Sequence, residues 1–204
     1  MNAGVALVQS YLNLNGYLTV TEFPVIRGRP GGWFQEVTDV DIMAVRFPDA
    51  GQVVPRGQPG PADDLRLETD PLLKPATAAV DVLVCEVKEG KARLNDATRT
   101  HEALYAALTR VGCVPPAVME RTISHLQERG EARVDGDHAT APARIRLMAF
   151  GEGESGRRRR FTVVSLRQVA RFVERHLDRY HRVLHPADLA DPVLGILHLL
   201  RKLD

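Results

Sequence analysis

Cysteine is nearly absent from this 204-residue chain, which carries only Cys85 and Cys113. Two thiols cannot supply a disulfide framework or a zinc site with four cysteine ligands, so a reducing setting is expected. No apolar run approaches the roughly 20 residues of a membrane-spanning helix, and the opening residues MNAGVALVQS lack the basic start of a secretory signal. The sequence therefore predicts a cytoplasmic protein that does not enter a membrane.

The chain also has little net charge and few aromatic side chains. The 27 Lys and Arg against 26 Asp and Glu leave a formal charge of +1, which is not the strongly basic balance of a protein that coats nucleic acid. Any contact with phosphate must therefore be local. Aromatic residues make up 5% of the chain, a content that does not indicate stacking platforms for single-stranded nucleic acid. Lysine is rarer still and occurs only at positions 74, 88, 91 and 202.

The first half of the chain has clear helix and strand patterns. Helical spacing of apolar residues, and then runs of β-branched and aromatic residues, predict a helix followed by a hairpin. A long stretch dominated by Pro, Gly, Asp and Ala predicts an excursion on the surface, outside the central sheet. In chain order we expect a helix at 3–14, hairpin strands at 17–26 and 36–47, the excursion at 48–79 and a buried strand at 80–88.

Helices and strands alternate in the second half. Asn95 can cap a helix that ends at Gly112, and a second helix is predicted to end at Gly130. The Asp135-Gly136 pair is typical of a hairpin turn. RIRLMAF and FTVVSL predict two strands separated by a polar turn, Ser165 and Gln168 form a capping box for a long helix, and Asp191 with Pro192 begins the last helix.

These elements predict one α/β domain over residues 1–204. We expect a helix-hairpin insertion at 114–141 and C-terminal helices at 166–204. The insertion resembles the helix and wing of a winged-helix DNA reader, but a helix-turn-helix needs two helices in sequence. An insertion that decorates the central sheet is therefore the preferred interpretation.

A carboxylate and an amine lie two positions apart inside the apolar run VLVCEVKEGK. Because strand side chains alternate between faces, Glu86 and Lys88 share one face, and Cys85 lies in the core on the other. In TDVDIMAV the same alternation places Asp39 and Asp41 together. Each strand therefore carries acidic residues at one end of a row of side chains that faces the core.

If these two strands are neighbours, Asp41 and Glu86 converge, and two carboxylates held together repel each other unless a cation lies between them. Carboxylates, a backbone carbonyl such as that of Val87 and several waters describe a Mg²⁺ or Mn²⁺ site better than a zinc site. Lys88 would add positive charge where negative charge accumulates on a phosphoryl group. The residues also allow a simpler interpretation, in which Glu86 and Lys88 are an ordinary strand-end ion pair.

The first helix, GYLTVTEFPV, TDVDIMAV, VLVCEVKEG and the following helix together resemble the core of the PD-(D/E)xK nuclease superfamily, the restriction-endonuclease-like fold. The resemblance covers residues 3–111, and the strands and helix of 143–184 would complete the sheet. It implies a central mixed β-sheet flanked by helices. It also implies a magnesium-dependent deoxyribonuclease in which Asp41 and Glu86 bind the metal and Lys88 is the catalytic lysine.

Further residues are candidates for accessory roles at such a site. Many members of the superfamily carry an acid in the first helix, whereas MNAGVALVQSYLNLNG has none, and Glu22 is the only nearby substitute. Residues 95, 99 and 102 would share one face of the following helix. The candidate accessory residues are Glu22, Asp39, Asn95 and Arg99, and the candidate DNA contacts are Lys91 and Arg93.

Two interpretations of function stay open. The first is hydrolysis of phosphodiester bonds in DNA, with a homodimer as a candidate assembly because nucleases that cut both strands are commonly dimers. The second is a binding or structural module that keeps the nuclease fold but does not cleave, which the missing first-helix acid and the near-neutral charge favour. The run Arg157 to Arg160 is read as a solvated turn, and the pair His181 and His185 lacks a third metal ligand.

Overall fold

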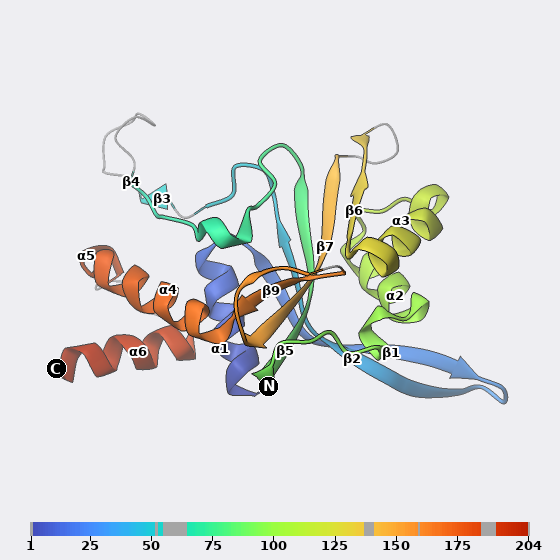
Figure 1. The fold of residues 1–204 in the computed structure, drawn as a ribbon, viewed down its shortest axis with the longest axis horizontal. Helices are drawn as coiled ribbons and strands as arrows, with labels where there is room; N and C mark the ends of the chain where they lie inside the picture. Colours follow the sequence, from blue (N-terminus) through green and yellow to red (C-terminus); the bar gives the residue numbers. More distant parts are fainter. Residues whose placement is uncertain are drawn as a thin grey trace.

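The protein is an α/β fold built on a seven-stranded mixed sheet with helices on both faces (Figure 1). The computed structural model describes residues 2–51, 53–54, 65–136, 141–158, 160–184 and 191–203. The sheet order is β1-β2-β5-β7-β9-β8, and β6 also pairs with β7. Its strands are β1 (Leu18–Arg29), β2 (Trp33–Arg46), β5 (Val80–Lys91), β6 (Glu131–Val134), β7 (Ala143–Glu152), β8 (Gly156–Arg157) and β9 (Thr162–Ser165).

The pairing within this sheet is mixed. Strands β1, β2 and β5 form an antiparallel meander, whereas β5 and β7 are parallel. Strand β9 is parallel to β7, and β8 lies antiparallel on its outer edge. The polar segment after β7 is therefore not the simple turn predicted from sequence, because its residues include a short edge strand and lead to a parallel neighbour.

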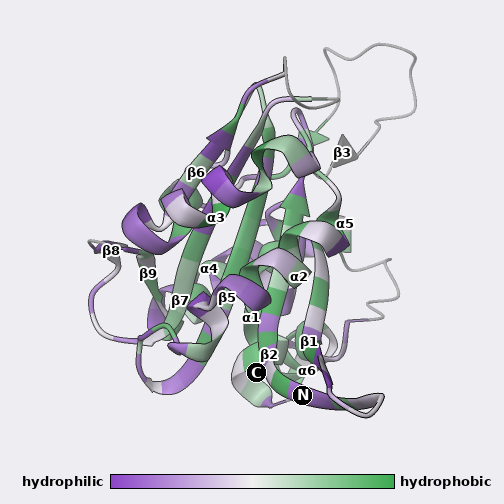
Figure 2. Cartoon of the chain, turned by 90° about the vertical axis from the view of Figure 1, so that its right-hand side faces the viewer, coloured by the Kyte–Doolittle hydropathy of each residue, from purple (hydrophilic) through white to green (hydrophobic). Residues whose placement is uncertain are grey.

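Two core clusters lie on opposite faces of the sheet. Helices α1, α4 and α6 cover one face, on which Cys85 is buried, and α2 and α3 cover the other (Figure 1). Apolar residues follow the central strands, and polar residues follow the outer sides of the helices (Figure 2). The helices are α1 (Ala3–Leu14), α2 (His101–Val111), α3 (Pro116–Arg129), α4 (Leu166–Arg179), α5 (His181–Leu184) and α6 (Pro192–Leu203).

Side-chain caps fix several helix ends. Ser165 begins α4 by accepting from the Gln168 N–H at 3.1 Å, as predicted. The second half of the capping box is absent, because the Gln168 side chain donates to Asp70 at 3.3 Å instead. Asp191 begins α6 and accepts from two backbone N–H groups at 3.0 and 3.1 Å. The long helix expected after Ser165 ends at Arg179, and His185 lies outside the described residues.

Part of the predicted excursion contributes to the core. Within residues 48–79, strands β3 (Val53–Val54) and β4 (Leu65–Arg66) form a separate two-stranded sheet. The 3-10 helix η1 (Pro71–Leu73) follows, and Leu67 and Leu73 are buried against α1 and the central sheet. Residues 52 and 55–64 lie outside the described part of the chain.

The predicted insertion at 114–141 packs on the central sheet. Helix α3 ends at Gly130, whose left-handed φ of 68° favours glycine. A side chain there would also collide with the Arg160 carbonyl, 1.8 Å from the position of an added Cβ. Strand β6 then pairs antiparallel with β7, which itself pairs with β5. None of the helices in the described residues is both long enough and apolar enough to cross a membrane.

Candidate functional site

Strands β2 and β5 separate at the predicted acid pair. Their pairing runs from Arg46 opposite Asp81 to Ile42 opposite Cys85 and then stops. Asp41 and Glu86 occupy the next facing positions, which in an antiparallel pair point to the same face of a sheet. Beyond this fork β2 pairs only with β1, and the two strands continue as an arm that projects from the body (Figure 1).

Asp41 is held by the backbone of the neighbouring strand. Its Oδ2 accepts a hydrogen bond from the N–H of Val87 at 2.6 Å, so the carboxylate replaces the ladder hydrogen bond that is lost at the fork. This contact engages one oxygen, and within the described part of the chain the other oxygen of the half-buried side chain accepts no hydrogen bond. The carboxylate is therefore positioned at the mouth of the fork.

Glu86 is more deeply buried, with 3% of the residue exposed. Its Oε2 accepts from the Thr98 hydroxyl at 2.7 Å, and its Oε1 lies 2.5 Å from the Lys88 ammonium. The Lys88 side chain is 35% exposed, so the positive charge reaches the surface while the carboxylate stays inside. The predicted grouping of Glu86 and Lys88 on one strand face is thus present, in the form of an ion pair.

The charges at the fork influence one another. Burial raises the pKa of Asp41 above its usual value, the negative charges of Glu86 and Asp39 raise it further, and the Val87 N–H and Lys88 partly offset these effects. Burial alone would lower the pKa of Lys88, but its hydrogen bond and ion pair with Glu86 reverse the direction and raise it. Asp41, Glu86 and Lys88 therefore form one electrostatic group, in which added positive charge would stabilise the ionised acids.

The donors at the fork fit magnesium better than zinc. Among the described residues no three His, Cys, Asp or Glu side chains are grouped to hold a metal ion. Mg²⁺, however, is usually bound through one or two carboxylates and keeps several waters or substrate oxygens. Asp41 and Glu86 are the two carboxylates that such a site would use, and burial together with the neighbouring charge of Glu86 raises the pKa of Asp41.

Two other predicted acids lie near the fork in different ways. Glu22 on β1 stands opposite Asp41, between the paired residues Thr21 and Phe23, and its φ of 51° is unusual for a residue other than glycine. Asp39 is exposed, and its charge reaches Asp41. The predicted alternation does not extend to Asp39, because residues 40 and 43, which have opposite parity, pack in the same core cluster.

The helix after β5 begins later than predicted. Asn95 does not cap it; its side chain accepts from the Ala97 N–H at 3.2 Å in a turn that leads into the 3-10 helix η2 (Ala97–Arg99). Thr100 caps α2 instead. Arg99 contacts Asp96 and the backbone of α3, whereas Glu102 pairs with Arg27 of β1. The expected shared helix face of residues 95, 99 and 102 is therefore wrong.

Thr98 is the residue at the fork that sequence reasoning missed. It is fully buried in η2 and its hydroxyl orients Glu86. The only signal in the sequence was a threonine within the polar run NDATRT directly after the strand. Because its role depends on a turn that brings η2 back over β5, periodicity alone could not identify it.

The predicted DNA contacts are exposed at the end of β5. Lys91 pairs in register with Glu152 of β7. The positive charge of Arg93 acts to lower the pKa of Lys88, but the opposing effect of Glu86 is larger. Gly151 allows this tail to pass close to β7, because an added Cβ would lie 2.7 Å from the Gly90 carbonyl oxygen. Lys91 and Arg93 are therefore carried on a segment whose path depends on Gly151.

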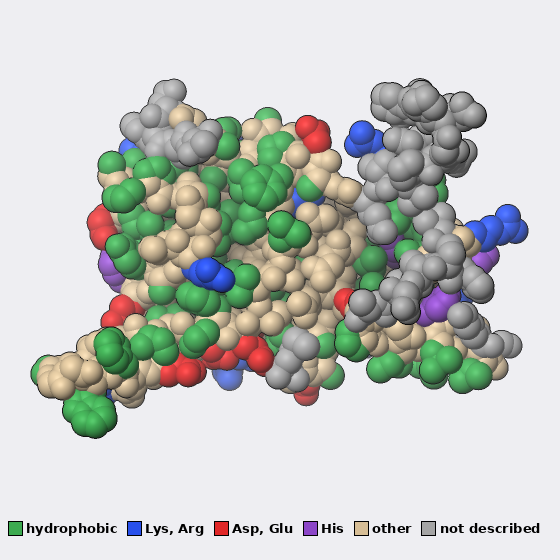
Figure 3. Space-filling model, turned by 180° about the vertical axis from the view of Figure 1, so that it is seen from behind, with side chains coloured by type: hydrophobic (Ala, Val, Ile, Leu, Met, Phe, Trp, Pro, Cys, Tyr) green, Lys and Arg blue, Asp and Glu red, His purple; other side chains and the backbone are tan. Residues whose placement is uncertain are grey.

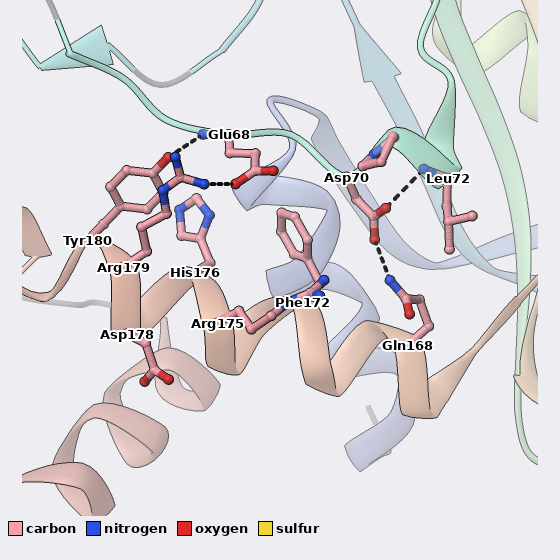
Figure 4. Close-up of a pocket in the computed structure, with 11 residues that line it drawn as sticks. Glu68, Asp70, Leu72, Gln168, Phe172, Arg175, His176, Asp178, Arg179 and Tyr180 are labelled. Carbon is pink, nitrogen blue, oxygen red and sulfur yellow. Dashed lines mark hydrogen bonds and ion pairs between the residues drawn. The ribbon is translucent and has the colours of Figure 1, made fainter.

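A cavity lies away from the fork, on the opposite face of the sheet. It has a volume of about 820 Å³ and lies between α4 and the segment around Asp70 (Figure 4). His176 lines it between the rings of Phe172 and Tyr180, and among the described residues its two buried ring nitrogens have no hydrogen-bond partner. We assign the candidate site to the fork, because the convergent acids and the lysine are there and the cavity contains none of them.

The fork thus combines two carboxylates and a lysine at the surface end of a buried strand. Such a group can bind a divalent cation and place positive charge beside a bound phosphate. Comparisons of this chain with protein-family models, with curated proteins and with solved structures found no match.

Proposed function

We propose that this chain is a metal-dependent nuclease that hydrolyses phosphodiester bonds in DNA. The observation that carries the proposal is the fork, where Asp41 and Glu86 face each other on adjacent antiparallel strands and Lys88 is paired with Glu86. The same three residues carry the resemblance to the PD-(D/E)xK superfamily in the sequence.

The arrangement of the elements supports a restriction-endonuclease-like fold. The stretches that carry the resemblance lie together: α1 packs on the antiparallel meander β1-β2-β5, and α2 follows β5. Strand β7 then extends the sheet in parallel with β5, and β9 follows it. The fold is thus compatible with the resemblance, and the site, rather than the fold, supports the chemistry.

In this proposal Asp41, Glu86 and the Val87 carbonyl would hold Mg²⁺ or Mn²⁺. When bound, the cation supplies charge neutralisation on phosphoryl oxygens and makes water more acidic. Val87 fixes Asp41 through its N–H, and Thr98 fixes Glu86 through its hydroxyl. Lys88, whose pKa is raised by Glu86, stays protonated and stabilises the negative charge that develops on the phosphoryl oxygens in the transition state.

A second candidate is a nuclease-fold module that binds DNA or supports another protein without cleaving. One specific observation favours it: both oxygens of Glu86 already have partners, Thr98 and Lys88, and a metal ion would have to share one of them. A carboxylate can accept several contacts, so this observation does not exclude the nuclease. The two candidate functions therefore differ in whether the fork binds a metal ion.

The deciding experiment incubates the purified chain with plasmid, linear and branched DNA in Mg²⁺, Mn²⁺ or Ca²⁺. A nuclease cleaves in Mg²⁺ or Mn²⁺, and in Ca²⁺ it binds DNA without efficient cutting, because Ca²⁺ holds its ligands in looser geometry. The Asp41→Asn variant is the matched negative control for contaminating nucleases. Binding without cleavage in every metal, together with no metal-dependent thermal stabilisation, would identify the non-cleaving module.

The assembly and the compartment are further parts of the proposal. Cys85 and Cys113 are free and pack in clusters on opposite faces of the sheet, which supports a reducing, cytoplasmic setting. The homodimer stays a prediction, and light scattering across a range of protein concentrations tests it.

A further inference from the structure

The arm formed by β1 and β2 exposes large aromatic side chains. Beyond the fork its two strands pair only with each other, from Phe23 opposite Val40 to Arg29 opposite Trp33. Trp33 is 76% exposed and Phe34 is 77% exposed, although aromatic residues are few in this chain. Hydrophobic side chains at the tip and acidic side chains near its base are visible in Figure 3. Such exposure at a projecting tip indicates a binding surface.

A tight turn places these rings at the end of the arm. Gly31 and Gly32 adopt left-handed φ values of 86° and 79°, which allow the tight turn directly before Trp33. Trp33 stands opposite Arg29, and Phe34 stands opposite Gly28. Facing residues share a face, so Trp33 and Arg29 lie on one side of the arm and Phe34 on the other.

The Trp33 side of the arm is continuous with the fork. Arg27 is two residues from Arg29 and therefore shares its face of the strand, and Arg27 forms an ion pair with Glu102 of α2. Helix α2 directly follows η2, which supplies Thr98 to Glu86. The aromatic tip, the arginines and the acid pair are thus connected along one side of the molecule.

We propose that the arm binds DNA beside the cleavage site, with Trp33 stacked on an unpaired base and Arg29 in contact with a phosphate. This inference rests on the proposed nuclease function. Trp33 lies eight residue steps before Asp41, and at about 3.3 Å per step the tip lies up to roughly 26 Å from the fork. That length corresponds to about eight nucleotide steps of 3.4 Å along one strand of duplex DNA.

The shape of the tip favours an unpaired base over an intact duplex. A ring that stacks on a base needs an exposed base face, which paired and stacked bases do not offer. Arg29 is the charged residue directly beside Trp33, whereas Glu36 and Asp39 lie nearer the fork, so the tip itself suits an anionic ligand such as a DNA phosphate. Branched, gapped or single-stranded DNA is therefore the substrate class that the arm fits.

Trp33 is the only tryptophan in the chain, so its fluorescence reports on the tip alone. The experiment titrates the protein in Ca²⁺, which limits cleavage, with a single-stranded 20-mer, a blunt duplex and a duplex with splayed ends. The anisotropy of labelled DNA gives the affinity in parallel. We expect the single strand and the splayed duplex to quench Trp33, and the blunt duplex to quench it less. Trp33→Ala should weaken binding of the splayed duplex by about 5- to 100-fold.

The control variant is Phe47→Ala, which removes an exposed aromatic ring outside the arm and should leave affinity unchanged. DNA that binds while Trp33 fluorescence stays constant would overturn the proposed contact and leave the nuclease function intact. A fluorescence change with anionic vesicles alone, or with protein concentration alone, would overturn it in favour of a membrane or a second copy. Quenching by DNA without cleavage in Mg²⁺ would support the arm and contradict the nuclease.

Discussion

Asp41 and Glu86 face each other on antiparallel strands one position beyond the last paired residues, Ile42 and Cys85. The acid pair therefore lies where the ladder ends, and Asp41 takes the place of a backbone acceptor by binding the Val87 N–H. Because one element, β5, carries Glu86, Val87 and Lys88, the geometry of the site depends mainly on how β2 leaves β5.

Replacement of Lys88 by alanine should remove most cleavage and leave metal and DNA binding largely intact. The ammonium contributes in the transition state, and the loss of one such charge typically reduces kcat by about 10²- to 10³-fold. Single-turnover cleavage assays measure the effect, with DNA binding measured separately in Ca²⁺. Lys74→Ala, which removes an exposed lysine outside the fork, is the matched control. Wild-type cleavage by Lys88→Ala in Mg²⁺ would show that Glu86 and Lys88 are an ordinary ion pair.

Replacement of Asp41 by asparagine should stabilise the metal-free protein at pH 7 and abolish stabilisation by Mg²⁺ or Ca²⁺. The pKa of Asp41 is raised in the folded state, so its charged form opposes folding, and this cost grows as pH rises through the raised pKa. Below the ordinary carboxyl pKa, about 3.9, the variant and the wild type should converge. Thermal melts across pH, with and without metal, measure both effects, and Glu154→Gln, an exposed acid outside the fork, is the control.

Thr98→Val should weaken metal binding by about 10- to 100-fold while the fold is retained. The hydroxyl donates to Glu86 at 2.7 Å and orients it, and partners that hold a ligand in this way typically contribute that much to affinity. Isothermal titration with Mn²⁺ measures the change. Thr98→Ser keeps the hydroxyl and should restore the affinity; equal weakening by both variants would show that Thr98 acts through packing.

His176→Leu should reduce the loss of stability below pH 6.5. Burial lowers the pKa of His176, and although Glu68 opposes this, the unfolded chain binds the proton more readily between the lowered pKa and 6.5. Stability of the wild type therefore falls as pH decreases through that window. Urea unfolding from pH 7 to pH 5 measures the difference, and the exposed His181→Leu variant should keep the wild-type profile. A profile unchanged by His176→Leu would contradict the assignment.

Local patterns predicted the features that depend on neighbouring residues. Alternation in β5 placed Glu86 and Lys88 on one face and Cys85 in the opposite core, as observed. The hairpin of β1 and β2 followed from β-branched residues around a Gly and Pro turn. The same alternation failed at Asp39, because the backbone of Glu22 on the paired strand is left-handed and interrupts the regular ladder beside residue 41.

Features that depend on distant pairing could not be predicted. Asn95 has the side chain of a helix cap, but the chain makes a separate turn there, so α2 begins at Thr100 and Thr98 reaches Glu86. The parallel arrangement of β7 and β9 depends on which edges meet, and not on either strand alone. Two adjacent aromatic residues in a sequence can be buried or exposed, so the exposure of Trp33 and Phe34 could not be predicted from residue type alone.

The central position of β5 has a consequence for biosynthesis. One edge of β5 pairs with β2, which the ribosome makes earlier, and the other pairs with β7, which begins only at residue 143. At about 5–20 residues per second, residues 92–142 take several seconds to emerge. During that interval the second edge of an apolar strand has no native partner, and such edges promote aggregation. Slower translation should therefore lower the soluble yield, and a chaperone that covers extended segments should restore it.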